Sequence, residues 1–260
     1  MKRKSMGFIG GGRVVRVLLG GFQRAGTLPT DCVVADAKPA VLEALAQRFP
    51  GIRAVGADIA EPARQDLVFA ALHPPVLGEV LPEIGRHLRP EAIFVSLAPK
   101  PRLDRLAGAL GGFTRIARFI PNAPSIVQAG FNPISFSAAL NPSDKSELLA
   151  QLKVLGECPE VADETLEAYA ILTAMGPTYF WFQFEELAKL GGSFGLAPTV
   201  TRHALSRMLH GAVDTLFAAD LPAMEVMDLI PVKPLEASES TLREAYRAAL
   251  TGLHGKLIAR

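Results

Sequence analysis

The stretch GFIGGGRVVRVLL, residues 7–19, decides the fold of this chain. It is typical of a short buried strand, a glycine turn and the opening of a helix, an arrangement in which backbone N–H groups and a helix N-terminus face a pyrophosphate. Gly10 permits the tight turn, and Gly12 lets a phosphate approach because no Cβ stands between it and the backbone. Val15 occupies the third small position of this fingerprint, so the stretch alone leaves open a glycine turn in another kind of α/β protein.

The composition indicates a globular protein that handles small molecules. Its 260 residues suit one large or two modest domains, and 49% hydrophobic residues are ample for a core. A net charge of +1, from 27 basic and 26 acidic residues, gives no basic surface for nucleic acid or for an anionic membrane. We therefore expect a small neutral or anionic metabolite as the partner, with no nucleic acid and no membrane.

The cysteines and the N-terminal residues predict a cytoplasmic protein. Cys32 and Cys158 lie 126 positions apart, which is no metal or redox spacing, so we expect no metal and a reducing compartment. Basic residues 2–4 before an apolar run imitate a signal peptide, but Arg13 and Arg16 interrupt that run. The apolar runs stay shorter than the roughly 18 to 20 residues of a membrane span.

Apolar runs and helical patterns alternate through residues 1–160, which we expect to form a dinucleotide-binding domain. Continuous apolar strands between helices are typical of a parallel sheet covered on both faces. We therefore expect an α/β fold of the Rossmann type with a doubly wound sheet. The expected strands after the first are residues 32–36, 52–55, 66–72, 92–97, 115–120 and 131–137, and the expected helices after the first are residues 40–49, 76–88 and 141–155.

Ligands of such sheets bind beyond the carboxyl ends of the strands. His73, residues 98–100 and the glycine turn meet at that edge in the expected fold. Asp36 closes the second strand 24 residues beyond Gly12, where an acid binds the adenosine ribose. The alternative for Asp36 is a turn residue, or a cap of the helix that begins near Pro39.

From about residue 163 the pattern is helical to the end. Residues 179–184 are apolar on nearly every side, as expected of a helix that is buried all round, and a long helix begins at Pro198. A domain of about 100 residues cannot hide so much apolar surface alone. We therefore expect residues 161–260 to form an all-helical domain that makes a homodimer, or a larger oligomer, with the active sites near the seam.

Five segments stand out in order along the chain: GFIGGG (7–12), VVADAKPAVLEAL (33–45), RFIPNAPS (118–125), LTAMGPTY (172–179) and FGLAP (194–198). Together they resemble the pyrroline-5-carboxylate reductase family across nearly the whole chain. The deazaflavin-dependent NADP reductases and the 6-phosphogluconate dehydrogenase-like enzymes share the nucleotide domain but match the helical half less well. The resemblance implies a Rossmann domain and a helical dimerisation domain like the C-terminal domain of 6-phosphogluconate dehydrogenases. It also implies hydride transfer from NAD(P)H to a cyclic imine carboxylate.

The resemblance places a coenzyme site at the glycine turn and the carboxyl edge of the sheet. His73-Pro74 stands in place of a family Lys-Pro, and Asn122 lies in the stiff Pro-Asn-x-Pro loop that lines the nicotinamide. Each has a local alternative, His73 as a helix-start residue rather than a proton donor and Asn122 as a turn residue. The implied coenzyme-binding residues are Gly10, Gly11, Gly12, Arg13, Val14, Asp36, Lys38, His73, Pro74, Ala98 and Asn122.

The choice between NAD(H) and NADP(H) depends on the residues that follow the second strand. Asp36 suits the two ribose hydroxyls of NAD, and Ala37 stands where many family members place an arginine for the extra phosphate of NADP. Lys38 could supply that charge instead. We expect NAD(P)H as the coenzyme, with a preference for NAD(H).

The substrate half departs from the family pattern. The family's Ser-Pro-Gly-Gly-Thr-Thr turn, whose N–H groups and hydroxyls hold the substrate, is absent, and residues 230–235 read IPVKPL in its approximate place. Two prolines remove donors that glycines would present. We expect Lys233, with Thr173 and Asn122, to form a replacement anion clamp; the alternative is a solvated lysine. The catalytic candidates are Thr173 and Lys233, and the substrate-binding candidates are Asn122, Thr173, Gly176, Tyr179 and Lys233.

Two functions stay open at this point. The first is an NAD(P)-dependent reductase of a small, acidic imine or keto compound, pyrroline-5-carboxylate among them, which would place the protein in proline and amino-acid metabolism. The second is a non-catalytic relative that binds a dinucleotide as a structural or regulatory ligand. Polar groups that converge on the nicotinamide favour the enzyme, whereas a site sealed by Met175 and the prolines favours the binder.

Overall fold

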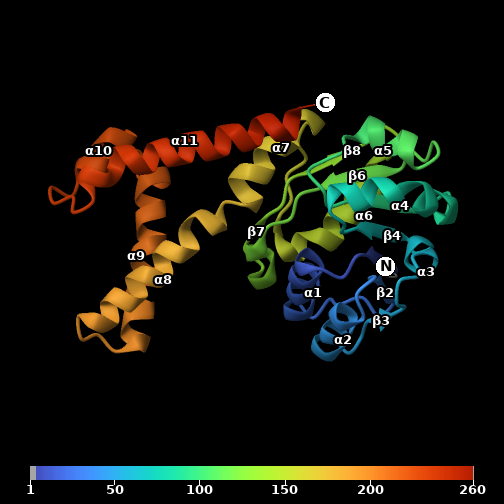
Figure 1. The fold of residues 1–260 in the computed structure, drawn as a ribbon, viewed down its shortest axis with the longest axis horizontal. Helices are drawn as coiled ribbons and strands as arrows, with labels where there is room; N and C mark the ends of the chain where they lie inside the picture. Colours follow the sequence, from blue (N-terminus) through green and yellow to red (C-terminus); the bar gives the residue numbers. More distant parts are fainter. Residues whose placement is uncertain (1–3, 260) are drawn as a thin grey trace. The chain divides into compact units, whose positions relative to one another are not determined.

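The computed structural model describes residues 4–259, which divide into two compact units. One unit runs to Met175 and takes in the last residues from His254, and the other is Gly176–Leu253 (Figure 1). The first unit thus continues past residue 160. The domain boundary that we expect after residue 160 stays a prediction.

A predominantly parallel sheet forms the centre of the first unit. Among the described residues, seven strands pair in the order β3-β2-β1-β4-β5-β6-β8, and only β8 runs antiparallel to its neighbour. The chain starts at β1 and winds outward in both directions, so the expected Rossmann-type, doubly wound fold is confirmed. The bounds are β1 Met6–Ile9, β2 Cys32–Ala35, β3 Arg53–Ala54, β4 Leu67–Ala70, β5 Ile93–Ser96, β6 Ile116–Phe119 and β8 Ile134–Phe136.

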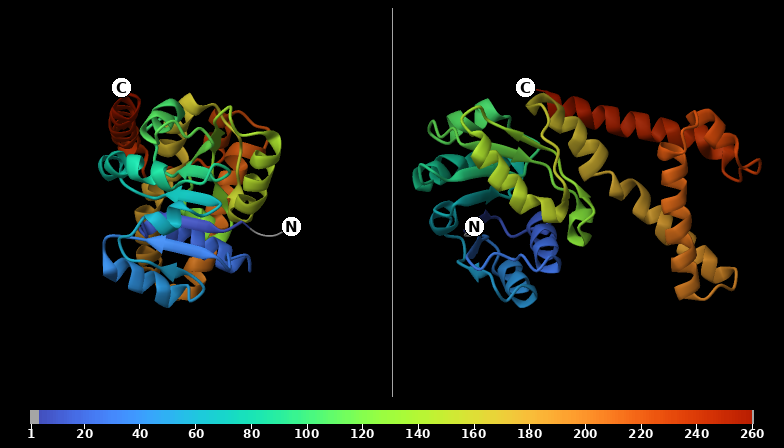
Figure 2. Two further views of the ribbon diagram at one scale, coloured as in Figure 1. Left: turned by 90° about the vertical axis from the view of Figure 1, so that its right-hand side faces the viewer. Right: turned by 180° about the vertical axis from the view of Figure 1, so that it is seen from behind.

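Helices cover both faces of this sheet. Successive residues of a strand point to opposite faces, so each strand contributes side chains to two cores. In β1, Phe8 packs into the core of one face and Ile9 into the core of the other. In β4, Phe69 stacks on Phe8 with 4.9 Å between ring centroids, while Ala70 joins the opposite core. Burial on both faces explains the continuous apolar runs in the sequence. One face carries α1 Arg13–Arg24, α2 Pro39–Arg48 and α6 Pro142–Leu152, and the other carries α3 Ala60–Ala63, α4 Pro74–His87 and α5 Leu103–Ala109 (Figure 2).

Residues 131–137, which we expected to form one strand, form parts of two. β7 (Gly130–Phe131) ends before Asn132, and β8 begins after Pro133, which has no N–H to donate to a ladder. β7 pairs with β9 (Gly156–Glu157) in a small second sheet. The sequence pattern also missed the short helices α3 and α5 and the single turn η1 Ala123–Val127, whereas η2 Lys153–Leu155 and η3 Asp163–Thr165 lie in segments that were expected to be helical.

The helical segment expected from about residue 163 contains a wide turn near its start. α7 (Leu166–Tyr169) passes directly into a π-helical turn, Ala170–Ala174, which we call the wide turn. The Thr173 hydroxyl donates to the carbonyl of Tyr169 at 2.8 Å, and such a bond inside a helix competes with the backbone ladder. Turns of this kind are frequent at functional sites.

Helices fill the second unit, as expected. α8 and α9 cross closely, since a Cβ at Gly191 would lie 2.4 Å from the Thr201 side chain. The prediction that residues 179–184 are buried on every side is wrong for the single chain, in which Phe182 is 66% exposed. No helix within residues 4–259 combines the length and the apolarity of a membrane span. The bounds are α8 Pro177–Ser193, α9 Pro198–Ala218, α10 Ala223–Asp228 and α11 Glu236–Ile258.

Candidate active site

The glycine turn between β1 and α1 has two glycines that are needed for different reasons. Gly10 has φ +92°, in the left-handed region, and a Cβ there would lie 2.6 Å from the carbonyl oxygen of Ala71. Gly12 is the N-cap of α1, with φ −70°, and apart from the adjacent chain no heavy atom of the described residues lies within 4 Å of the position that its Cβ would take. The fold therefore requires glycine at position 10, while position 12 faces open space at the start of a helix. Such a position suits a phosphate group.

Asp36 is tied to this turn. One carboxylate oxygen accepts a hydrogen bond from the N–H of Gly11 at 2.8 Å, and the other accepts from the N–H of Lys38 at 2.8 Å. The carboxylate therefore holds the end of β2 against the glycine turn and stabilises the start of α2, whose N-cap is Lys38. Asp36 thus acts as a turn residue, which was the local alternative for it. Its role in binding the adenosine ribose stays a prediction.

His73 and Ala98 follow the ends of β4 and β5, at the edge where the coenzyme is expected. His73 is the exposed N-cap of α4 and Pro74 is the first helical residue, which fits the interpretation of His73 as a helix-start residue. Ala98 is 4% exposed, and its N–H points to the hydroxyl of Ser96 at 3.4 Å. Arg13 and Val14 open α1 beside the glycine turn.

Asn122 joins three segments at the same edge. Its amide nitrogen donates to the carbonyl of Thr173 at 3.3 Å, and its amide oxygen accepts from the N–H of Phe131 at 3.2 Å. Its own N–H donates to the side chain of Asn132 at 3.0 Å, and Asn122 is only 8% exposed. Asn122 thus holds the Pro-Asn-x-Pro loop to the wide turn. The structure brings the candidates Asn122 and Thr173 together.

The other substrate candidates lie in the second unit. Gly176 is the buried N-cap of α8, and the Tyr179 ring meets the Tyr246 ring edge to face at 5.9 Å between centroids. Burial raises the pKa of the Tyr179 hydroxyl, and the neighbouring Tyr246 adds to the shift. Lys233 lies in a groove of about 850 Å³ formed by residues 224–243, and its ammonium group is 3.6 Å from a carboxylate oxygen of Asp228.

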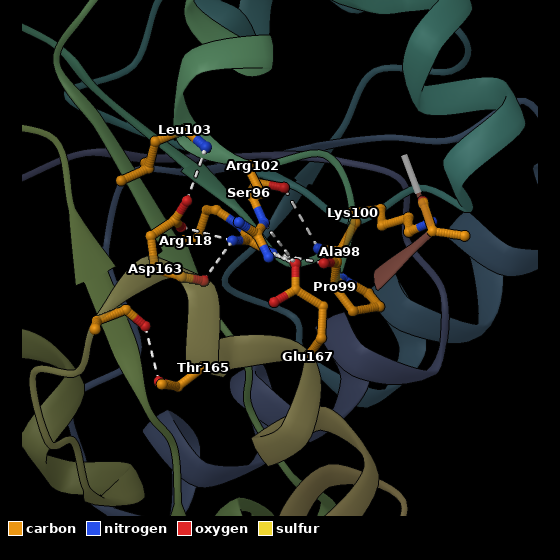
Figure 3. A network of polar contacts seen from close by, with 12 residues as sticks. Ser96, Ala98, Pro99, Lys100, Arg102, Leu103, Arg118, Asp163, Thr165 and Glu167 are labelled. Atoms are coloured by element: carbon orange, nitrogen blue, oxygen red, sulfur yellow. Dashed lines mark hydrogen bonds and ion pairs between the residues drawn. The ribbon is translucent and has the colours of Figure 1, made fainter. Parts of the chain in front are cut away.

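A buried ion cluster at Arg118 was missed by the sequence analysis. The Arg118 side chain is fully buried in β6, and its guanidinium group faces Asp163 and Glu167, with Pro99 alongside (Figure 3). The signal that could have revealed it is one charged residue inside the apolar run of residues 116–120. A charge in a strand that is buried on both faces needs partners elsewhere in the fold.

Comparison with known proteins gives the family. A family model described as "NADP oxidoreductase coenzyme F420-dependent" matches residues 5–100. The pyrroline-5-carboxylate reductase of Escherichia coli (strain K12) is 33% identical over 195 residues, which cover 73% of this chain and 71% of that protein. The chain belongs to the pyrroline-5-carboxylate reductase family. The resemblance drawn from the five sequence segments is thereby confirmed.

Other members of the pyrroline-5-carboxylate reductase family extend the match over both units. Human pyrroline-5-carboxylate reductase 2 is 25% identical over 228 residues, which cover 86% of this chain and 71% of that protein. The pyrroline carboxylate reductase of Plasmodium falciparum, solved with NADP bound, has the same fold, with a TM-score of 0.80 over 99% of this chain and 96% of that chain at 19% identity. The Coxiella burnetii enzyme gives a TM-score of 0.73 over 98% of this chain and 97% of that chain, at 22% identity.

Proposed function

We propose that this protein transfers hydride from NAD(P)H to the C=N bond of a small, acidic substrate, as a reductase of the pyrroline-5-carboxylate reductase family. The observation that carries the proposal is the glycine turn, whose open position at Gly12 faces the carboxyl edge of a Rossmann-type sheet. Asn122 and the wide turn with Thr173 meet through a hydrogen bond within the same unit. These residues supply a dinucleotide site and polar groups for a reacting substrate.

The substrate itself is the open part of this proposal. We infer that Lys233, together with Thr173 and Asn122, replaces the substrate turn of the family and binds a carboxylate. The Lys233 side chain is 39% exposed in its groove, and the acid beside it, Asp228, is 86% exposed. A substrate carboxylate could therefore compete with Asp228 for the ammonium group, because exposed ion pairs contribute little free energy. Gly176 and Tyr179 complete the proposed substrate-binding set.

We propose NAD(H) as the preferred coenzyme. The Asp36 carboxylate lies beside the glycine turn, where its negative charge would oppose the 2′-phosphate of NADP and accept hydrogen bonds from the two ribose hydroxyls of NAD. Ala37 offers no charge to balance that phosphate, and Lys38 is the one cation in the immediate sequence. The remaining coenzyme contacts proposed for His73, Pro74 and Ala98 follow from their place at the carboxyl edge.

A turnover screen tests the function and the coenzyme together. We expect the protein to oxidise NADH, and NADPH less efficiently, when it is given pyrroline-5-carboxylate or related cyclic imines with a carboxylate. Absorbance of the reduced coenzyme measures the rate, and calorimetry measures the two coenzyme affinities. Tight coenzyme binding without turnover of any imine would instead indicate a non-catalytic protein. A Kd for NADPH tenfold below that for NADH, about 1.4 kcal/mol, would reverse the coenzyme preference.

We further propose a homodimer built on the helical unit. Its helices leave large apolar side chains in water: Phe182 is 66% exposed, Phe194 is 77% exposed and Phe217 is 81% exposed. Large apolar side chains that stay exposed in a folded unit commonly mark an interaction surface. α10 and α11 have no buried residue in the described chain, so a second copy of the unit is the partner that we expect to cover them. A cytoplasmic location, expected from the wide spacing of the two cysteines, stays a prediction.

The dimer predicts the mass of the protein in solution. Light scattering at micromolar concentration should give at least about twice the chain mass of 27.7 kDa. Phe182→Arg should lower that mass, because a charge in an apolar interface is costly to bury, while the control Phe182→Leu should preserve it. A mass near 27.7 kDa for the unmodified protein would contradict the proposal.

A further inference from the structure

The strand β6 contains a buried charge that the proposed reaction does not use directly. Arg118 is the largest of the fully buried side chains, with an exposed fraction of 0%. Its neighbours in β6 are apolar, and the strand lies inside the sheet between β5 and β8. Burial of a guanidinium group costs free energy unless good partners surround it, so the identity and position of those partners indicate its role.

Arg118 binds two separate segments with one planar group. Its Nη2 atom donates to the carbonyl of Pro99 at 2.5 Å and to Glu167 Oε1 at 3.2 Å. Its Nη1 atom donates to the carbonyl of Asp163 at 3.1 Å and to the carboxylate of the same residue at 2.5 Å. The half-exposed Arg102 places its Nε atom 3.6 Å from the same Glu167 oxygen. Figure 3 shows these groups converging on the guanidinium plane.

The two segments face different parts of the proposed site. Pro99 belongs to the loop after β5, residues 97–100, which we call the coenzyme-side loop because it includes the coenzyme candidate Ala98. Glu167 belongs to α7, which leads without interruption into the wide turn. The guanidinium group therefore links the coenzyme-side loop to the helix that carries Thr173.

The segment from Arg118 to Asn122 contacts the helical segment of residues 166–174 at a second point. Asn122 follows Arg118 by four residues and donates to the carbonyl of Thr173, at the far end of the wide turn. Arg118 thus holds the helix before the wide turn, at Glu167, and Asn122 holds it within the wide turn. A π-helical turn is rare because its geometry is less favourable than that of an α-helix, so it needs support from outside the helix.

The cluster is not arranged for stability alone. Arg118 Nε and Glu167 Oε2 are buried without a hydrogen-bond partner among the described residues. Each such atom costs free energy, and a pair of apolar side chains of similar length would fill the space without that cost. The planar guanidinium group donates to Pro99 and to Glu167 at once, and an apolar pair could not make these two directed bonds.

We propose that Arg118 is a positioning residue of the active site, which sets the distance between the coenzyme-side loop and the wide turn that carries Thr173. This inference rests on the proposed function, because Thr173 and Ala98 are assigned by that proposal. Hydride transfer requires a donor and an acceptor held at a fixed separation, and a shift of about 1 Å is enough to slow such a reaction about 100-fold. Arg118 itself touches neither coenzyme nor substrate in this role.

The test compares Arg118→Lys with the double variant Arg118→Met/Glu167→Met. Lysine keeps the charge but lacks the planar fork, and the two methionines replace the buried pair with flexible apolar chains. We expect kcat to fall about 10- to 100-fold in both variants, while the Kd of the coenzyme changes less than about threefold. The melting temperature of the double variant should fall less than that of Arg118→Met alone, which also leaves the Glu167 carboxylate buried without its partner; both variants lose the bonds of Arg118 to Asp163 and Pro99. Arg102→Met is the matched control, since Arg102 is 45% exposed and lies 3.6 Å from the Glu167 carboxylate; its kcat should be unchanged.

A second measurement keeps the inference separate from the proposed reaction. Hydrogen exchange should become at least about tenfold faster in residues 170–175 of Arg118→Lys, and stay unchanged in β1 and β4. If the unmodified protein reduces no imine, the proposed function fails, and the exchange result still decides whether Arg118 supports the wide turn. Unchanged exchange in residues 170–175 would overturn the inference. Normal kcat in a folded double variant would also overturn it, since the cluster would then be structural only.

Discussion

Gly12→Val should raise the Kd for NADH and for NADPH at least about 100-fold, or about 2.7 kcal/mol, and leave the melting temperature of the coenzyme-free protein nearly unchanged. The space beside Gly12 is open in the described chain and its φ of −70° is negative, so valine meets no steric conflict there and loses only the small N-cap preference for glycine. The same space is where a pyrophosphate must approach the start of α1. Calorimetry and thermal unfolding measure the two quantities independently.

Gly10→Ala provides the matched contrast. A Cβ at position 10 would lie 2.6 Å from the backbone oxygen of Ala71, and φ +92° is unfavourable for alanine. This variant should unfold at a lower temperature, by an amount that reflects several kcal/mol, whether or not coenzyme is present. If Gly12→Val instead bound coenzyme normally, or lost as much stability as Gly10→Ala, the glycine turn would not be the coenzyme site.

The Rossmann-type half could be predicted from the sequence because its signals are local and its rules are general. The strands β1, β2 and β4 are continuous apolar runs, which is what strands buried on both faces require. The glycine turn likewise carries its own geometry, since the positive φ of Gly10 requires the residue type that the sequence shows. The strand at residues 131–137 was misjudged because apolar character alone does not reveal that Pro133 interrupts a ladder.

The wide turn and the Arg118 cluster depend on contacts between residues far apart in the chain. Arg118 and Glu167 are 49 positions apart, and the bond of Asn122 to Thr173 spans 51. No periodicity in a window of the sequence reports such pairs, so the segment was expected to be an ordinary helix. The exposed Phe182 shows a second limit: an all-apolar helix indicates burial, but the sequence does not say which molecule covers it.

Asp36 and Asn122 each had two expected roles, a structural role within the chain and a ligand-binding role. The structure shows the structural role of both, and this role is compatible with ligand binding. Asp36 binds the N–H groups of Gly11 and Lys38, as a turn residue would. Asn122 binds Phe131 and Thr173, as a structural amide would. Polar side chains at a ligand edge need partners that orient them, and those partners are what a rigid site requires.

Lys233→Met should raise KM for an acidic substrate about tenfold or more, equivalent to about 1.4 kcal/mol, and leave the Kd of the coenzyme unchanged. Among the described residues, the ammonium group of Lys233 pairs with a largely exposed carboxylate, Asp228, so its removal should cost little folding free energy. A change in KM can then be assigned to binding of the substrate rather than to a damaged fold. Steady-state kinetics with an acidic substrate and with its uncharged amide measure the effect, which should appear for the acid alone.

Lys189→Met is the control for this experiment. Lys189 lies on α8 with 63% of its side chain exposed, and it pairs with Glu185 at 3.2 Å, one helical turn away. It is a solvated lysine of the kind that Lys233 would be if the anion clamp did not exist. Its loss should therefore leave KM unchanged for both substrates. If Lys233→Met behaves in the same way, the substrate carboxylate is held elsewhere, and the prolines on either side of Lys233 serve only to end α10 and start α11.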